Sequence, residues 1–257
     1  MLNFRNTTIL FIILLVASTG YDALFNLPAS VYFIIAFAYF LFLFYGSYFV
    51  GSGFFIKVIC SATTGKKVIA ITFDDGPATS YTPEILDLLR EHKVETAFFC
   101  IGSRIAGNEE LFQRLHAEGH IIGNHSFSHH FWFDLFSAKK MLADLERMDR
   151  EMEKLTGLRP RFFRPPYGVT NPNLRKAIEK GNYIPVGWSI RSMDTVIKDK
   201  NKLLNKINRL MQPGAIILFH DTSKTTRDIL PAFIRQCREN GYEIKRLDKM
   251  LTLNAYA

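Results

Sequence analysis

Two aspartates stand together where a hydrophobic strand should end. Asp74 and Asp75 follow the apolar run 68–73 and precede a Gly-Pro pair that is typical of turns. Neighbouring residues of a regular strand point to opposite faces, so both carboxylates can serve one site only where the strand breaks. One carboxylate could then bind a cation while the other faces the reacting water. The alternative interpretation is an Asx turn whose second aspartate is solvated.

Two histidines lie four residues apart, at His125 and His129. Their imidazoles reach a common point if the segment forms a helical turn. With one aspartate they would make three ligands and leave one position open for water, which is typical of catalytic zinc. A lone His-x-x-x-His pattern is a weak signal by itself. The adjacent His130 has poorer geometry, and we expect it in packing or in contacts behind the ligands.

Two further segments carry groups suited to binding and proton transfer. Arg164 precedes two prolines that exclude helix, so its guanidinium could clamp a carboxylate and a later N–H could bind an oxyanion. His220 ends the apolar run 215–219 and precedes Asp221, and a histidine beside an acid is suited to proton donation. In isolation, each motif is equally consistent with a structural turn or strand end.

Strand and helix signals alternate after residue 66. Seven apolar runs predict strands at 68–73, 96–101, 120–123, 161–164, 183–190, 215–219 and 242–247. Six segments predict helices at 82–92, 109–118, 137–157, 171–181, 201–211 and 228–240. This alternation predicts an α/β fold with a parallel sheet, either a closed barrel or an open sheet. The chemistry-bearing residues follow strands, which is where barrel active sites are built.

Five motifs, taken in order, resemble those of the polysaccharide deacetylases of carbohydrate esterase family 4, also called the NodB homology domain. The matching segments are 72–77, 125–129, 164–167, 188–194 and 218–220. The resemblance covers about residues 66–250. It implies a distorted (β/α) barrel of about seven strands and a divalent metal, usually zinc. It also implies removal of N-acetyl groups from amino sugars. We expect a polysaccharide or a lipid-linked glycan as the substrate, and a domain on the cytoplasmic side of a membrane would favour the lipid-linked one.

The resemblance implies a role for each motif residue. It assigns Asp74 as general base and His220 as general acid. The metal ligands it assigns are Asp75, His125 and His129. Arg164 would hold Asp74, and Asp194 would set up the acid histidine.

The acetyl pocket is less completely specified by the resemblance. The Tyr167 N–H would help to bind the oxyanion, while Trp188 and Leu218 would wall the pocket. Many relatives carry an aspartate at the position of Arg191 and an aromatic residue at that of Thr195. These two departures leave the sugar specificity open.

The first 60 residues differ in composition from the rest. They hold only three charged side chains, although the chain has 32 Lys/Arg and 24 Asp/Glu. Two apolar stretches, at about 7–24 and 30–50, are candidates to cross a bilayer as helices. The first could instead be the core of a signal peptide. We therefore expect a membrane segment at 1–60, a linker at 61–66 and a catalytic domain at 67–257.

The positive charges near these stretches predict an orientation. Arg5 precedes the first stretch, Lys57, Lys66 and Lys67 follow the second, and the connecting loop has none. The positive-inside rule then places both ends, and the catalytic domain, on the cytoplasmic face of the inner membrane. If only 30–50 spans with its N-terminus inside, the domain lies outside the cytoplasm.

The expected partners are an N-acetylated glycan and the membrane. Basic residues are scattered despite the net charge of +8, which argues against nucleic acid, and no obligate protein partner is implied. Three widely spaced cysteines argue against a disulfide framework. Two alternative functions remain: O-deacetylation or deformylation by the same site, and glycan binding by a membrane-tethered protein with a vestigial site.

Overall fold

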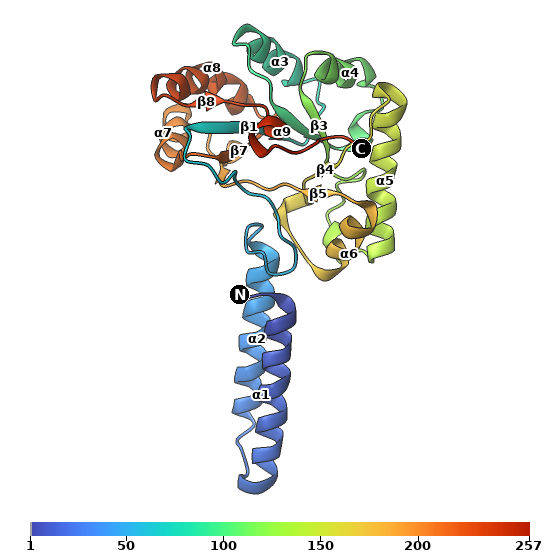
Figure 1. Cartoon of the computed structure of the whole chain (residues 1–257), viewed down its shortest axis with the longest axis vertical. Helices are drawn as coiled ribbons and strands as arrows, with labels where there is room; N and C mark the ends of the chain where they lie inside the picture. Colours follow the sequence, from blue (N-terminus) through green and yellow to red (C-terminus); the bar gives the residue numbers. More distant parts are fainter. Residues whose placement is uncertain (1) are drawn as a thin grey trace.

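One curled parallel sheet organises the larger part of the chain. The computed structural model describes residues 2–257 (Figure 1). Its strands run in the order β5-β4-β3-β2-β1-β7-β6, with β8 paired to the start of β1. The sheet forms a half-barrel, which confirms the predicted distorted barrel. The strands are β1 (Val68–Asp74), β2 (Ala97–Cys100), β3 (Ile121–Asn124), β4 (Phe162–Phe163), β5 (Ile184–Pro185), β6 (Ile190–Arg191), β7 (Ala215–His220) and β8 (Glu243–Ile244).

Amphipathic helices connect the strands close to the predicted positions. They are α3 (Thr82–Glu91), α4 (Glu109–Ala117), α5 (Ala138–Thr156), α6 (Pro172–Gly181), α7 (Lys200–Leu210), α8 (Lys224–Glu239) and α9 (Leu247–Leu251). Ser137 and Asn171 cap α5 and α6, because each side chain accepts a hydrogen bond from a first-turn N–H. Ser223 caps α8 in the same way, so this helix begins four residues before the predicted start at 228.

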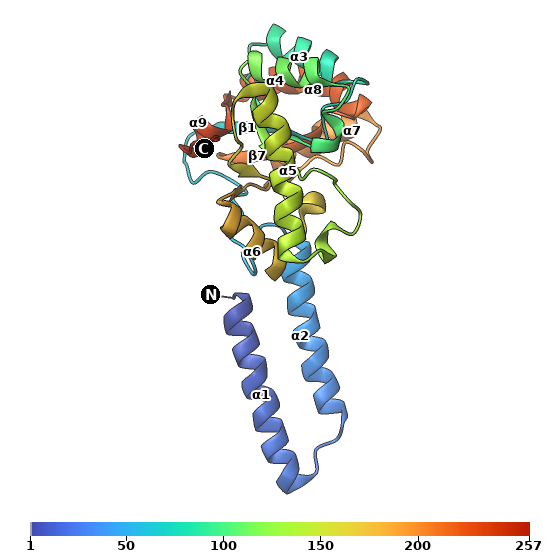
Figure 2. The ribbon, with the colours of Figure 1, turned by 90° about the vertical axis from the view of Figure 1, so that its right-hand side faces the viewer.

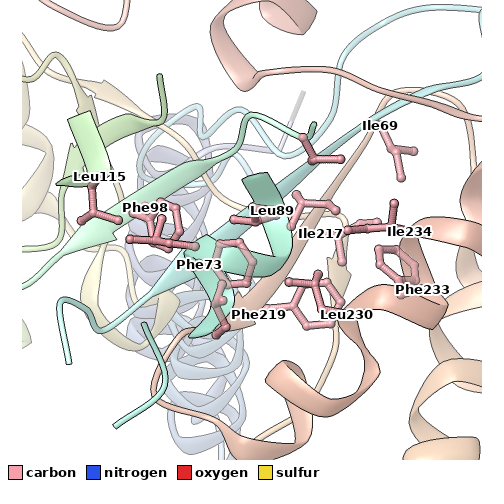
Figure 3. Close-up of a cluster of buried hydrophobic side chains, with 14 of the residues drawn as sticks. Ile69, Phe73, Leu89, Phe98, Leu115, Ile217, Phe219, Leu230, Phe233 and Ile234 are labelled. Atoms are coloured by element: carbon pink, nitrogen blue, oxygen red, sulfur yellow. The ribbon is translucent and has the colours of Figure 1, made fainter. Parts of the chain in front are cut away.

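The core lies on both faces of the sheet. Phe73, Phe98 and Phe219 on the helix-covered face pack together and against side chains of α3, α4 and α8 (Figure 3). On the inner face, Ala70 and Phe99 belong to a separate cluster that includes residues of α9 and the C-terminal segment. Burial of both faces explains why β1 and β7 read as continuous apolar runs.

One predicted strand, 183–190, is divided in the structure. Gly187 donates its N–H to the Ile59 carbonyl, and its own carbonyl accepts a hydrogen bond from Arg164. The chain therefore leaves the sheet after β5 and rejoins it at β6, and Trp188 lies in the segment between these two strands. A similar division occurs at 242–247, where β8 ends at Ile244 and α9 begins at Leu247.

Two long apolar helices form an antiparallel hairpin that projects from the half-barrel. They are α1 (Phe4–Phe25) and α2 (Ser30–Tyr48), and each is long and apolar enough to cross a membrane. The start of α1 and the end of α2 lie at the same end of the hairpin, next to the sheet domain (Figure 2).

The hairpin is attached to the sheet domain by a buried segment. Phe54, Phe55 and Ile56 belong to one hydrophobic cluster that also includes residues of α5 and α6. Ile59 then forms a parallel bridge with Val186. Within 61–66, the segment expected as a linker, Ser61 bridges Ala215 and the Ala62 N–H donates to Gly214. The chain thus enters the domain along the open side of the half-barrel.

Candidate active site

The predicted site residues converge at the carboxyl ends of the strands. Eight of the ten line a single pocket of about 100 Å³, and Arg164 and Asp194 lie directly behind it, bonded to pocket residues. The lining residues are Asp74, Asp75, His125, His129, Pro165, Tyr167, Gly168, Trp188, Arg191, Leu218 and His220. The strand ends therefore bring together side chains that are up to 146 positions apart in sequence.

Three of these side chains form a cluster suited to a metal ion. Asp75 Oδ1 lies 3.6 Å from His125 Nε2 and 3.5 Å from His129 Nε2, and the three donor atoms all lie within 4.8 Å of one another. His125 Nδ1 lies 2.9 Å from the Arg164 carbonyl oxygen. A carbonyl only accepts, so Nδ1 carries the proton and Nε2 offers its lone pair. Two imidazoles and one carboxylate fit a divalent metal such as zinc.

The two histidines meet without the helical turn that the sequence suggested. Ser126 and His129 have positive φ values of 63° and 42°, and the Ser126 hydroxyl accepts a hydrogen bond from the His129 N–H. The Asp144 carboxylate accepts from the N–H groups of Phe127 and Ser128. Positive φ values at residues other than glycine are strained and concentrate at functional sites. The loop, held by these hydrogen bonds, presents both rings to one point.

The protonation state of His129 suits a ligand. Burial lowers its pKa to about 4, and the neighbouring His125 opposes the charged form further. The imidazole is therefore neutral across the physiological range, as metal coordination requires.

Asp74 is held by a fully buried arginine. Arg164 Nη1 donates to Asp74 Oδ1 at 2.7 Å and to the Thr72 hydroxyl at 2.8 Å. The other guanidinium nitrogens donate to the carbonyls of Val186 and Gly187, and the guanidinium carbon lies 4.0 Å from the centre of the Phe99 ring. Asp74 Oδ2 points the other way and lies 3.8 Å from His125 Nε2. One carboxylate oxygen is thus fixed while the other faces the candidate metal cluster.

His220 is paired with Asp194. His220 Nδ1 lies 2.8 Å from Asp194 Oδ1, and the His220 N–H donates to Asp194 Oδ2 at 2.8 Å. Hydroxyls of Ser192 and Thr226 also donate to this carboxylate. Burial lowers the pKa of His220, but the hydrogen bond and charge of Asp194 outweigh it and raise the pKa to about 9. His220 is therefore protonated at neutral pH, as a general acid must be.

The adjacent acid Asp221 does not pair with His220, which corrects the sequence interpretation. Its Oδ2 accepts a hydrogen bond from the Thr82 hydroxyl at 2.6 Å. The carboxylate lies so close to Gly76 that a Cβ there would come within 2.0 Å of Oδ2. Alternation along β7 explains this, because neighbouring residues point to opposite faces.

Several supporting residues have no distinctive sequence signal. Thr226 and Ser192 hold Asp194, and Arg104 donates to the Asp75 main-chain carbonyl. A threonine in the first turn of a helix and an exposed arginine are common in any α/β protein. Only the folded structure brings them to the site.

The three residues expected at the acetyl pocket lie together in the structure. Tyr167 adopts a φ of 58° within the turn Pro166–Gly168, and the Trp188 ring packs on Gly168, where a Cβ would lie 2.6 Å from it. Leu218 of β7 is buried beside them. Of the two departures, Arg191 lines the pocket, whereas Thr195 is exposed and is not among the lining residues that the structure describes.

Comparison with known proteins identifies the family. The polysaccharide deacetylase family model matches residues 61–186. Over 192 residues the chain is 34% identical to the peptidoglycan-N-acetylmuramic acid deacetylase PdaA of Bacillus subtilis (strain 168), covering 73% of each protein. The chain belongs to the polysaccharide deacetylase family. The chain is also 32% identical over 196 residues to the peptidoglycan-N-acetylglucosamine deacetylase PgdA of Listeria monocytogenes serotype 1/2a (strain 10403S), covering 76% of this chain and 41% of PgdA.

Solved structures show the same fold. The Bacillus subtilis PdaA structure matches with a TM-score of 0.70 and 32% identity, covering 76% of this chain and 85% of that chain. BA3943 of Bacillus anthracis, described as a family 4 pseudoenzyme, matches with a TM-score of 0.71 and 25% identity, covering 75% and 68%. A shared fold therefore does not decide activity in this family, and the site residues must carry that argument.

Proposed function

We propose that this protein is a metal-dependent hydrolase that removes N-acetyl groups from amino sugars of a glycan. The supporting observation is the arrangement of one pocket: the Asp75, His125 and His129 cluster lies beside Asp74, and His220 lines the same cavity. A glycan-binding protein needs neither a metal cluster nor two proton carriers.

Asp74 is the general base in this proposal. Its Oδ1 is held by Arg164, so Oδ2 is the atom that accepts a proton from the attacking water. A divalent metal, most simply zinc, held by Asp75, His125 and His129 would polarise the acetyl carbonyl and lower the pKa of that water.

The remaining residues act on the amide. The Tyr167 N–H stabilises the developing oxyanion, and Trp188 and Leu218 surround the acetyl methyl group. His220 protonates the departing amine, and Asp194 stabilises the imidazolium beforehand. An amide needs this proton because an amine anion is a very poor leaving group.

Acetate release from N-acetylated oligosaccharides tests the proposal. We expect the wild-type protein to release acetate and Asp74→Asn to release none while keeping the fold. A glycan-binding protein would instead retain glycan binding after chelation and release no acetate. Parallel O-acetylated and N-formylated substrates would show whether either alternative activity is the faster one.

We also propose that α1 and α2 anchor the protein in the inner membrane with the catalytic domain in the cytoplasm. Arg5 and Lys57 lie at the domain end of the hairpin, whereas the connecting loop has no positive charge. In intact cells carrying Cys60→Ser, an impermeant thiol reagent should label Ala29→Cys in the connecting loop but not Gly65→Cys. The reverse pattern would place the domain outside the cytoplasm.

A further inference from the structure

A groove joins the catalytic pocket to the end of the apolar hairpin. It has a volume of about 600 Å³ and is lined on one side by Tyr45, Tyr48 and Phe49, at the end of α2. Tyr167, Trp188 and Arg191 line its other side and also line the catalytic pocket. The groove and the catalytic pocket therefore adjoin, and a ligand that fills both would reach from the catalytic residues to α2.

A row of exposed aromatic side chains on α2 continues the groove along the hairpin. This aromatic stripe recurs at three- and four-residue spacing, which places its members on one helix face. Each member is more than half exposed: Phe33, Phe37, Phe40, Phe44 and Tyr48. The rings of Phe44 and Tyr48 stack with centroids 5.5 Å apart, and Tyr48 contacts Phe49 in the groove.

The aromatic stripe is not the face that holds the two helices together. Contact with α1 is made by Tyr39 and Phe42, whose rings lie 5.1 and 5.8 Å from that of Phe11. The aromatic stripe is thus left for an apolar partner outside the protein. In the proposed membrane orientation, that partner is the hydrocarbon of the bilayer.

An unpaired positive charge lies where the groove meets the pocket. Arg191 is exposed and forms no ion pair with an acidic residue within 2–257, and its guanidinium lies 5.9 Å from the centre of the Trp188 ring. The Lys206 ammonium donates to the carbonyls of Arg191 and Ser192, which adds a second positive charge nearby. An arginine with free donors is suited to binding a phosphate.

The groove is fixed relative to the catalytic residues. Thr170, three residues after Tyr167, donates its hydroxyl and its N–H to the carbonyls of Gly46 and Ser47 at the end of α2. Gly46 packs directly on Phe54, where a Cβ would lie 2.2 Å from the ring. These contacts hold the end of α2 in place, so it forms a fixed wall of the groove.

We propose that the substrate is an N-acetylated amino sugar joined through a phosphate to a long-chain lipid. The sugar occupies the catalytic pocket, the phosphate meets Arg191, and the lipid chain leaves through the groove along the aromatic stripe. Water cleaves the amide C–N bond to give acetate and the free amine, and the bonds to phosphate stay intact. This inference rests on the proposed deacetylase function and names its substrate class.

Matched synthetic substrates test the proposal with the full-length protein in phosphatidylcholine nanodiscs. The probes are farnesyl-phosphate-linked N-acetylglucosamine, its methyl-phosphate counterpart, and the farnesyl glycoside without phosphate. We expect kcat/KM for acetate release to be at least about tenfold higher for the first probe than for the phosphate-free probe, because one charge-assisted contact corresponds to about tenfold or more. It should also be at least about tenfold higher than for the methyl-phosphate probe, because the farnesyl chain buries apolar surface that a methyl group lacks. The phosphate-free farnesyl probe controls for partitioning into the nanodisc.

Two variants separate the phosphate from the lipid. Arg191→Gln should reduce the preference for the phosphate-linked over the phosphate-free farnesyl probe about tenfold. Tyr48→Ala should reduce the preference for farnesyl over methyl phosphate. Phe25→Ala, an equally exposed aromatic residue at the far end of α1, is the matched control and should leave both preferences unchanged.

The outcomes distinguish this inference from the deacetylase function. Equal kcat/KM for all three probes, with no effect of Arg191→Gln, would overturn the lipid-linked substrate and leave a deacetylase of soluble or polymeric glycans. Absence of acetate from every N-acetylated probe and oligosaccharide would refute the proposed function itself. In that case native mass spectrometry measures binding of the farnesyl-phosphate probe to the wild-type protein and to Arg191→Gln. Equal binding to both proteins would contradict the inference.

Discussion

Replacing Asp194 with asparagine tests how the site keeps His220, the proposed general acid, protonated. Asparagine is nearly the same size and can still accept the hydrogen bond from His220 Nδ1. It removes the negative charge that, with the hydrogen bond, raises the pKa of His220 to about 9. Burial still opposes the charged imidazole, and the charges of Asp74 and Asp75, which also favour it, remain. The pKa of His220 in Asp194→Asn should therefore fall toward its ordinary value of 6.5.

The magnitude follows from the protonated fraction at a working pH. At pH 7.5 a group with a pKa of about 9 is about 97% protonated, whereas a group with a pKa of about 6.5 is about 9% protonated. We therefore expect kcat/KM for N-acetyl substrates at pH 7.5 to fall at least about tenfold. A divalent cation on Asp75 would lower the pKa of His220 in both the wild-type protein and Asp194→Asn. The test therefore rests on the difference between the two pKa values.

The assay is the pH dependence of kcat/KM for acetate release, measured for both proteins. We expect activity to fall on the alkaline side as His220 loses its proton, and Asp194→Asn should move that limb to lower pH by about two units. With 4-nitrophenyl acetate, whose leaving group needs no proton, the variant should lose much less activity. An unmoved alkaline limb, or equal losses on both substrates, would refute the role of Asp194 in holding the acid.

Three other predictions concern the metal, the base and the buried arginine. Alanine at Asp75, His125 or His129 should each abolish bound metal with little change in thermal unfolding, whereas His130→Ala, next to the cluster, should keep it; metal analysis of the purified proteins checks this. Asp74→Asn should bind metal normally and show no turnover; residual turnover near the wild-type level would exclude Asp74 as base. Arg164→Met should lower the free energy of unfolding by about 3–5 kcal/mol, measured in urea, because the carboxylate of Asp74 stays buried without its partner.

The sequence predicts the catalytic end of the fold well. Residues 68–73 and 215–219 are apolar except for Thr72, as expected for strands with both faces buried, and a polar residue of the site follows each run. The carboxyl ends of parallel strands lie at one end of the sheet, so chain order places Asp74 and His220 at the same end, although it does not show that they are neighbours. Their Cα positions are register partners in the β1–β7 ladder.

The sequence predicts less where tertiary contacts override the local pattern. Phe54, Phe55 and Ile56 read as the tail of the membrane segment, yet they are buried among side chains of α5 and α6. Strand 183–190 is divided because Gly187 bonds to Ile59 and Arg164, which are distant in sequence. Asp221 stands beside His220 in the chain but faces Thr82 across the sheet. None of these contacts has a signal within a short sequence window.

Metal titration of the stripped protein tests the central claim most directly. The full-length chain is freed of metal with a chelator and zinc is returned in steps, while acetate release from an N-acetylated oligosaccharide is followed. We predict no acetate from the stripped protein, a linear recovery that ends at about one zinc per chain, and no recovery in Asp75→Ala. Full acetate release from the stripped protein would contradict the account, because the Asp75, His125 and His129 cluster would then have no part in the reaction.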